Sequence, residues 1–207
     1  MKLYGMGVSR SFRALWAAQE AGVELDYIIV AFGSTDKGGA QSNDYKQLNY
    51  QGKVPTLVDG DLVLTESAAV INYLANKAPQ QNLIPKDGTS DRAKYDQMCY
   101  FIVTELEQPL WSKGKHKFAL PEQYRVPDLI DRTLAFEFAK AQSTLLGLKS
   151  TSEFAVGDHF TMADVLLTQT LNWAQRFEFE IDASLLDYKE RMMQREAYSA
   201  AMQRTAT

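Results

Sequence analysis

The first 77 residues alternate between short β-like runs and a helical repeat of apolar positions. Residues 2–4 and 26–30 are apolar and β-like and predict two strands, whereas residues 11–21 place their large apolar side chains on one helix face. Polar residues and glycines dominate residues 31–49, where we expect a loop with at most one short helix. The pattern therefore predicts a β-α-β unit at the amino end.

A second β-rich segment follows. Residues 54–58 and 62–64 are two short apolar runs, and the Asp-Gly-Asp sequence at 59–61 between them is typical of a hairpin turn. Apolar residues then recur at helical spacing over residues 70–78. We expect β-β-α after the first unit, and hence a small α/β domain over residues 1–77.

The remainder of the chain has a helical pattern nearly throughout. Residues 78–89 contain two prolines and a glycine and predict a linker. Helices are then expected in four segments, at residues 91–106, 128–146, 162–176 and 185–202. The second domain, at 90–207, is predicted to be all-helical.

Charge and cysteine content limit the classes of function. The chain carries 22 basic and 26 acidic residues, so its net charge of −4 does not favour nucleic acid or an anionic membrane as a partner. The amino-terminal residues lack the long apolar run of a secretory signal. The single cysteine, Cys99, has no internal disulfide partner, which fits a reducing compartment. We expect a cytoplasmic protein.

Two short motifs offer groups that complement a peptide-like ligand. We predict that the Val54–Pro55 bond, at the entry to an edge strand, is cis and leaves the Val54 backbone free to pair with an extended peptide. Glu66 and Ser67 open a helix, where N–H groups and a hydroxyl suit a carboxylate and Glu66 suits an ammonium group. The alternative is a hairpin and an amphipathic helix without a ligand.

Taken together, these segments resemble the glutathione transferase family. The matching first-domain motifs are LYGMGVSRSFRALW, NYQGKVPTL and LTESAAVINYLA, and the resemblance extends over essentially the whole chain. It implies a thioredoxin-like first domain, an all-helical second domain and a homodimer. It also implies glutathione as co-substrate and a small hydrophobic electrophile as second substrate.

The resemblance also assigns the glutathione contacts. Val54 would pair with the cysteinyl backbone beside Lys53, Pro55 would be the cis proline, and Glu66 and Ser67 would hold the γ-glutamyl end. Related theta-like sequences often carry a histidine at the position of Ala40. Here the neighbouring Gln41 is either a donor to the glycyl carboxylate or a solvated loop residue.

The catalytic position falls in the loop before the first helix. Ser9 aligns with the activating serine of theta-like classes, and a hydroxyl ahead of a helix start can donate a hydrogen bond to a thiolate. The alternative is that Ser9 and Ser11 cap the helix. Tyr4 is a second candidate activator, although a packed strand residue is the commoner role. Arg10 and Arg13 either steer glutathione or lie on a solvated helix face.

Other eye-catching residues are expected to be structural. Thr161 and Asp164 form a variant of the capping box, so Asp164 is a folding element rather than a catalytic acid. Cys99 lies in an apolar run and is expected to be an inert core thiol. Two histidines far apart, with no cysteine cluster, give no metal-site spacing. The residues left open between core and electrophile pocket are Tyr100, Trp111, His116 and Phe118.

Several functions share these features. The prediction is a serine-type, theta-like enzyme that conjugates glutathione thiolate to electrophiles. One alternative is a glutathione-dependent reductase of disulfides or peroxides, and another is a non-catalytic binding module of the same fold. Maleylacetoacetate isomerases have a related fold, but their serine- and cysteine-rich loop is absent from residues 8–12.

Overall fold

The computed structural model of the chain describes residues 1–149 and 151–205, which divide into two compact units. The first unit comprises residues 1–84 together with the carboxyl-terminal segment from 193 onward, and the second comprises residues 85–192. The first unit contains the sheet, and the regular elements described in the second unit are all helices. The predicted fold class, a mixed α/β domain followed by an all-helical one, is confirmed.

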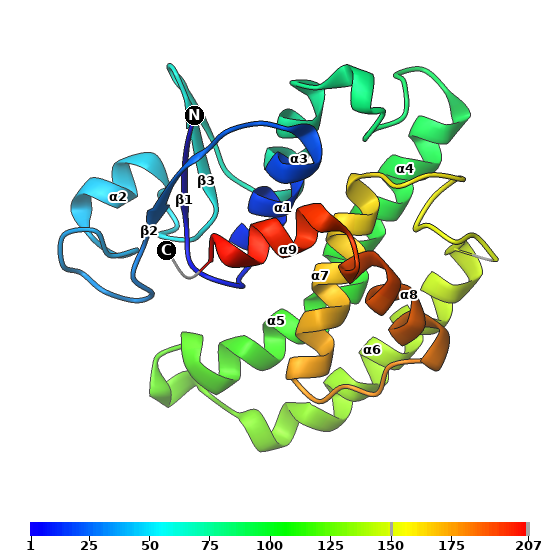
Figure 1. Cartoon of the computed structure of the whole chain (residues 1–207). Helices are drawn as coiled ribbons and strands as arrows, with labels where there is room; N and C mark the ends of the chain where they lie inside the picture. Colours follow the sequence, from blue (N-terminus) through cyan, green and yellow to red (C-terminus); the bar gives the residue numbers. More distant parts are fainter. Residues whose placement is uncertain (150, 206–207) are drawn as a thin grey trace. The chain divides into compact units, whose positions relative to one another are not determined.

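The first unit is built on a four-stranded sheet with the order β2-β1-β3-β4 (Figure 1). Its strands are β1 (Lys2–Gly5), β2 (Asp26–Ile29), β3 (Thr56–Asp59) and β4 (Leu62–Leu64). β2 pairs parallel to β1, which requires a crossover helix, whereas β3 is antiparallel to both β1 and β4. Gly60 supplies the left-handed turn between β3 and β4 at φ 59°.

Helices α1 (Ser11–Ala21) and α3 (Ser67–Asn76) pack against one another beside this sheet (Figure 1). Their facing sides are apolar, and Leu15, Ile71 and Leu74 are fully buried. α1 has the bounds that the sequence predicts, and it ends at Gly22 in the left-handed conformation of a helix C-cap. The predicted loop at 31–49 contains one short helix, α2 (Asn43–Leu48).

The last helix, α9 (Glu196–Gln203), belongs to the first unit and packs along α1 (Figure 1). Its Tyr198 ring meets Trp16 edge-on at 5.0 Å, and Arg195 forms two hydrogen bonds with Glu20 at 2.6 and 2.8 Å. The sequence pattern placed this helix in the helical domain at 90–207. Periodicity identifies a helix and its apolar face, but it does not specify the partner of that face.

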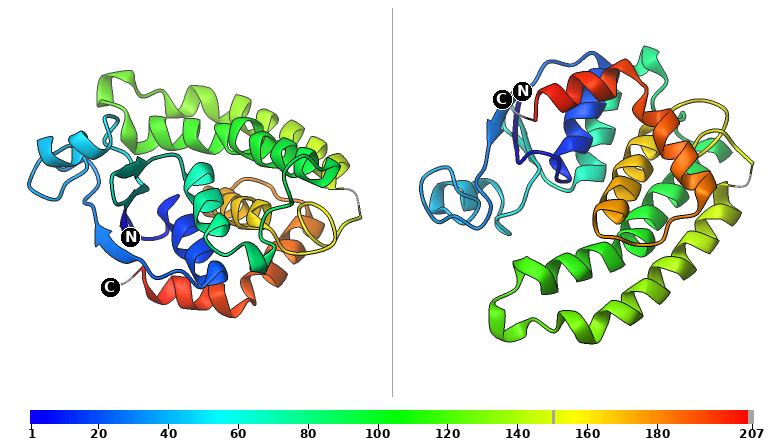
Figure 2. Two further views of the ribbon diagram at one scale, coloured as in Figure 1. Left: turned by 90° about the horizontal axis from the view of Figure 1, so that it is seen from above. Right: turned by 60° about the horizontal axis from the view of Figure 1, so that its bottom comes forward.

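The second unit contains five α-helices in its described residues, and α5 and α6 run side by side (Figure 2). They are α4 (Ser90–Phe101), α5 (Gln108–Gly114), α6 (Pro127–Lys149), α7 (Met162–Arg176) and α8 (Ala183–Met193). The predicted helix at 91–106 changes to π-helical geometry over Ile102–Leu106. Pro109 lies in the first turn of α5, where its missing N–H costs no intrahelical hydrogen bond.

Asp164 organises the start of α7 within the second unit. Its carboxylate accepts the Thr161 N–H at 2.8 Å, which confirms the predicted capping box. It also accepts the Ala155 N–H at 2.7 Å and the Tyr188 hydroxyl at 2.8 Å, so it joins a loop and a second helix to α7. Burial raises the pKa of this carboxyl, and the hydrogen bonds to its charged form oppose that rise.

Asp164→Ala should destabilise the protein more than the loss of an ordinary cap. Four donors, the Ala155 and Thr161 amides and the Thr161 and Tyr188 hydroxyls, lose their acceptor in a buried site, so we expect the free energy of unfolding to fall by roughly 2–4 kcal/mol. Urea denaturation measures this, with Asp158→Ala as the control because the Asp158 side chain is exposed. A fully stable Asp164→Ala protein without turnover would instead identify Asp164 as a catalytic acid.

Candidate functional site

The segments that carry the predicted ligand-binding residues leave the sheet of the first unit at the same end. In the antiparallel pair of β1 and β3, Tyr4 lies opposite Thr56. β1 therefore ends where β3 begins, and the loop that carries Ser9 is adjacent to the one that carries Pro55. The tertiary structure brings together two segments that are more than forty residues apart in the sequence.

Ser9 lies in the loop between β1 and α1, and its side chain is half-buried. Its hydroxyl accepts the Ser11 N–H at 3.2 Å and donates to Ser11 Oγ at 3.1 Å. Arg10, in the N-cap position of α1, makes no side-chain cap. Ser9 thus satisfies an amide of the first helical turn, as the capping alternative expects, and it stands where a helix start favours negative charge.

The other candidates near this loop have different surroundings. The Tyr4 ring packs against Tyr45, with centroids 5.9 Å apart, as expected of a packed strand residue. Arg13 is fully buried, so the expectation of a solvated helix face is wrong for this residue. Its Nη1 donates to Ser67 Oγ at 3.0 Å and ties α1 to the start of α3. An arginine inside an otherwise apolar helix face was the sequence signal for this role.

Glu66 and Ser67 form the start of α3, as the sequence predicts. Ser67 is 5% exposed and held by Arg13, whereas the Glu66 side chain is exposed. Glu66 has φ 64° and ψ 112°, a conformation that non-glycine residues rarely adopt. Such a residue costs of order 1–3 kcal/mol and is characteristic of functional sites. The strain presents an exposed carboxylate beside the helix N-terminus.

The loop before β3 is held by the side chains of Tyr45 and Asn49, for which the sequence predicted no such role. The Lys53 carbonyl accepts the Tyr45 hydroxyl at 2.6 Å and the Asn49 amide at 2.8 Å. Burial raises the pKa of Tyr45, which therefore remains a hydrogen-bond donor at neutral pH. The Val54–Pro55 bond is cis, as predicted. Asn49 begins the NYQGKVPTL motif, although no supporting role was predicted for it, and Tyr45 lies outside the three motifs.

Gln41 lies against this loop rather than in open solvent. Its side-chain amide donates to the Gly52 carbonyl at 3.3 Å. Gly52 has φ 60°, and a Cβ on it would lie 2.4 Å from both the Ala40 carbonyl oxygen and Gln41 Nε2. Only glycine allows this close approach, so Gln41 supports the segment that leads to Lys53.

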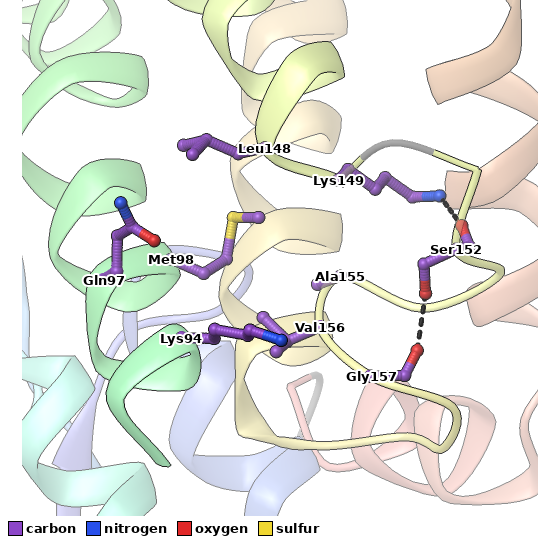
Figure 3. Close-up of a pocket in the computed structure, with 9 residues that line it drawn as sticks. All are labelled: Lys94, Gln97, Met98, Leu148, Lys149, Ser152, Ala155, Val156 and Gly157. Carbon is purple, nitrogen blue, oxygen red and sulfur yellow. Dashed lines mark hydrogen bonds between the residues drawn. The ribbon is translucent and has the colours of Figure 1, made fainter. Parts of the chain in front are cut away.

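The second unit carries a pocket of about 230 Å³ that none of the predicted ligand-binding residues lines (Figure 3). Met98 and Leu148 give it an apolar wall. Lys149 turns to the Ser152 carbonyl, and the Ser152 hydroxyl donates to the Gly157 carbonyl at 2.6 Å (Figure 3). The Lys149 ammonium and the Ser152 hydroxyl are therefore hydrogen-bonded to backbone carbonyls of the residues that line the pocket.

The remaining sequence candidates are dispersed in the second unit. Cys99 is buried, and burial raises the pKa of its thiol to about 12, so the expected inert thiol is confirmed. His116 accepts the Val126 N–H at 3.2 Å and closes a loop. Tyr100 and Phe118 are 68% and 44% exposed.

Among residues 1–149 and 151–205, no three His, Cys, Asp or Glu side chains are grouped to hold a metal ion. No helix in the described part of the chain has the length and apolarity needed to cross a membrane.

Comparison with known proteins gives matches over both units. A family model described as the N-terminal domain of glutathione S-transferase matches residues 1–76, and one described as its C-terminal domain matches residues 133–196. A glutathione S-transferase of Triticum aestivum is 32% identical and covers 86% of this chain and 81% of the relative. Glutathione S-transferase Z1 of Arabidopsis thaliana is 28% identical over 88% of this chain and 81% of the relative. The solved ternary complex of BphK, a bacterial transferase, has a TM-score of 0.85 at 25% identity, with 100% of both chains covered.

Proposed function

Because the chain belongs to the glutathione S-transferase family, we propose that it is a theta-like, serine-type enzyme that conjugates glutathione to small hydrophobic electrophiles. In this proposal Ser9 stabilises the glutathione thiolate, which attacks the electrophile and forms a carbon–sulfur bond. One observation carries it: the Ser9 hydroxyl lies ahead of α1, beside the strand end that also adjoins the Val54–Pro55 loop. The family binds glutathione, so this is the end of the sheet at which we place its thiol.

The task of the protein is to favour thiolate over thiol. A free thiol has a pKa of about 8.5, so most of it is protonated at neutral pH. The Ser9 hydroxyl donates to the sulfur but is a poor acceptor for its proton, so it stabilises the anion rather than acting as a base. The amide groups at the start of α1 add to this stabilisation through the positive end of the helix.

The rest of the tripeptide would be held by groups whose own supports are visible in the structure. We propose that the Val54 backbone pairs with the cysteinyl residue, beside the exposed Lys53 ammonium. Glu66 and Ser67 would hold the γ-glutamyl end, and Arg13 fixes Ser67 for this contact. Gln41 would support the loop.

We further propose a cytoplasmic homodimer. The single cysteine is buried and unpaired, which suits a reducing compartment. β4 is an edge strand of the sheet, and its Leu62 and Val63 are 39% and 42% exposed. An edge strand with exposed apolar residues favours association with another chain, and in this family we assign that partner to a second copy.

Ser9→Ala tests the proposed function directly. The pKa of enzyme-bound glutathione should rise by about one to two units because the thiolate loses its donor. Turnover at neutral pH should fall, affinity for glutathione should change little, and higher pH should restore much of the rate. Ultraviolet titration of the thiolate measures the shift, with Tyr4→Phe as control. A shift with Tyr4→Phe and none with Ser9→Ala would make Tyr4 the activating residue.

Glu66→Gly separates the effect of the strained Glu66 backbone on stability from the effect of its carboxylate on glutathione binding. Glycine adopts positive φ without penalty, so the free energy of unfolding should increase by roughly 1 kcal/mol. The affinity for glutathione should nevertheless fall by about 1–3 kcal/mol, because a charged hydrogen-bond partner is lost. Chemical denaturation and calorimetry measure the two effects. Unchanged affinity in the stabilised protein would remove Glu66 from the site.

The dimer has its own test. Light scattering should give a mass of roughly twice the 23.3 kDa of one chain. Val63→Lys should shift the equilibrium to monomer, because it places a charge in the proposed contact. Lys37→Ala, an exposed change in the loop before α2, should leave the mass unchanged. A wild-type protein that is monomeric at high concentration contradicts the proposal.

A further inference from the structure

Ser11 is closed off from solvent at the start of α1, two residues after Ser9. A Cβ on Gly5 would lie 2.7 Å from Ser11 Cβ and 2.6 Å from Cε2 of the Tyr27 ring. Because Gly5 has no side chain, both groups close over the end of β1, and Ser11 is 0% exposed. A hydroxyl in this position does not reach a ligand, so any influence of Ser11 on a ligand is indirect.

The two serine hydroxyls form a pair in which the direction of the hydrogen bond matters. Ser9 Oγ donates to Ser11 Oγ at 3.1 Å, and Ser11 Oγ also accepts the Met6 N–H at 3.2 Å. The Ser11 N–H in turn donates to Ser9 Oγ at 3.2 Å. A serine hydroxyl has one proton and two lone pairs. In this arrangement the only proton of Ser9 is directed at Ser11 and not at a ligand.

We propose that Ser11 is a positioning residue whose hydroxyl reverses this hydrogen bond when Ser9 donates to the glutathione sulfur. The inference rests on the proposed role of Ser9. As the Ser9 proton turns to the thiolate, the Ser11 proton turns to Ser9 Oγ across the same separation. Ser9 then accepts both the N–H and the O–H of Ser11, its two lone pairs are filled, and its single proton is directed at the sulfur.

This arrangement strengthens the donor as well as orienting it. In a chain of hydrogen bonds each hydroxyl polarises the next, so Ser9 becomes a better donor when Ser11 donates to it. The thiolate is favoured without contact between Ser11 and glutathione. The effect of Ser11 should be smaller than that of Ser9 and should disappear when the Ser9 hydroxyl is absent.

A double-mutant cycle with the thiolate titration as readout tests the proposal. Ser11→Ala should raise the pKa of bound glutathione by about half to one unit, while the calorimetric Kd changes less than about threefold. In the Ser9→Ala background, Ser11→Ala should add no further shift, because the two residues act as one unit. Ser11→Thr, which keeps the hydroxyl, should leave the pKa of bound glutathione at its wild-type value. Ser199→Ala, an exposed change on α9, should have no effect.

Two results with Ser11→Ala would overturn the proposal. A folded Ser11→Ala protein with wild-type thiolate pKa, beside a shifted Ser9→Ala protein, would limit Ser11 to structure and leave Ser9 as the activator. A shift that persists in the Ser9→Ala background would mean that Ser11 acts through the helix start. No shift with Ser9→Ala would instead refute the proposed function. If Ser11→Ala does not fold, Ser11→Cys, similar in size but a weak hydrogen-bonding group, makes the same test, and an unchanged pKa overturns the proposal.

Discussion

The antiparallel pairing of β1 with β3 is the constraint on which the candidate site depends. It places the end of one strand beside the start of the other, so the Ser9 loop and the Val54–Pro55 loop meet at one end of the sheet. A register shift of one residue would turn Leu3 and Leu57, both fully buried, away from the core. The burial of these side chains therefore also fixes the relative position of the two loops.

A second level of organisation acts through buried polar groups. Arg13 crosses from α1 to Ser67, Tyr45 and Asn49 hold the Lys53 carbonyl, and Ser11 holds Ser9. Each support is more buried than the group it positions. Polar groups removed from water keep their partners because an unmade hydrogen bond there is costly. The groups proposed to bind glutathione thus obtain their orientation from buried side chains of neighbouring segments.

The second unit also contains a buried polar group that holds several segments together, but this group has no role in the proposed chemistry. Asp164 is among the most buried acids of the described chain, and its partners are two backbone amides and the hydroxyls of Thr161 and Tyr188. An acid in a capping box, with every partner provided by the protein, is a structural centre. Glu66, also an acidic residue, is exposed and has a positive φ, and that difference in environment separates its proposed role from that of Asp164.

The sequence by itself determined most of the elements, the cis proline and the capping box, because these depend on neighbours within a few residues, whereas it did not predict α5. Ser11–Ala21 and Met162–Arg176 begin and end where caps and apolar spacing predict. Through the family resemblance, the sequence also identified the residues proposed to contact glutathione. Only the tertiary structure decided that α9 packs on α1, that Arg13 is buried against Ser67, and that the Tyr27 ring and Ser11 both lie against Gly5. These facts depend on which faces meet across long sequence separations, and periodicity carries no information about the partner of a face.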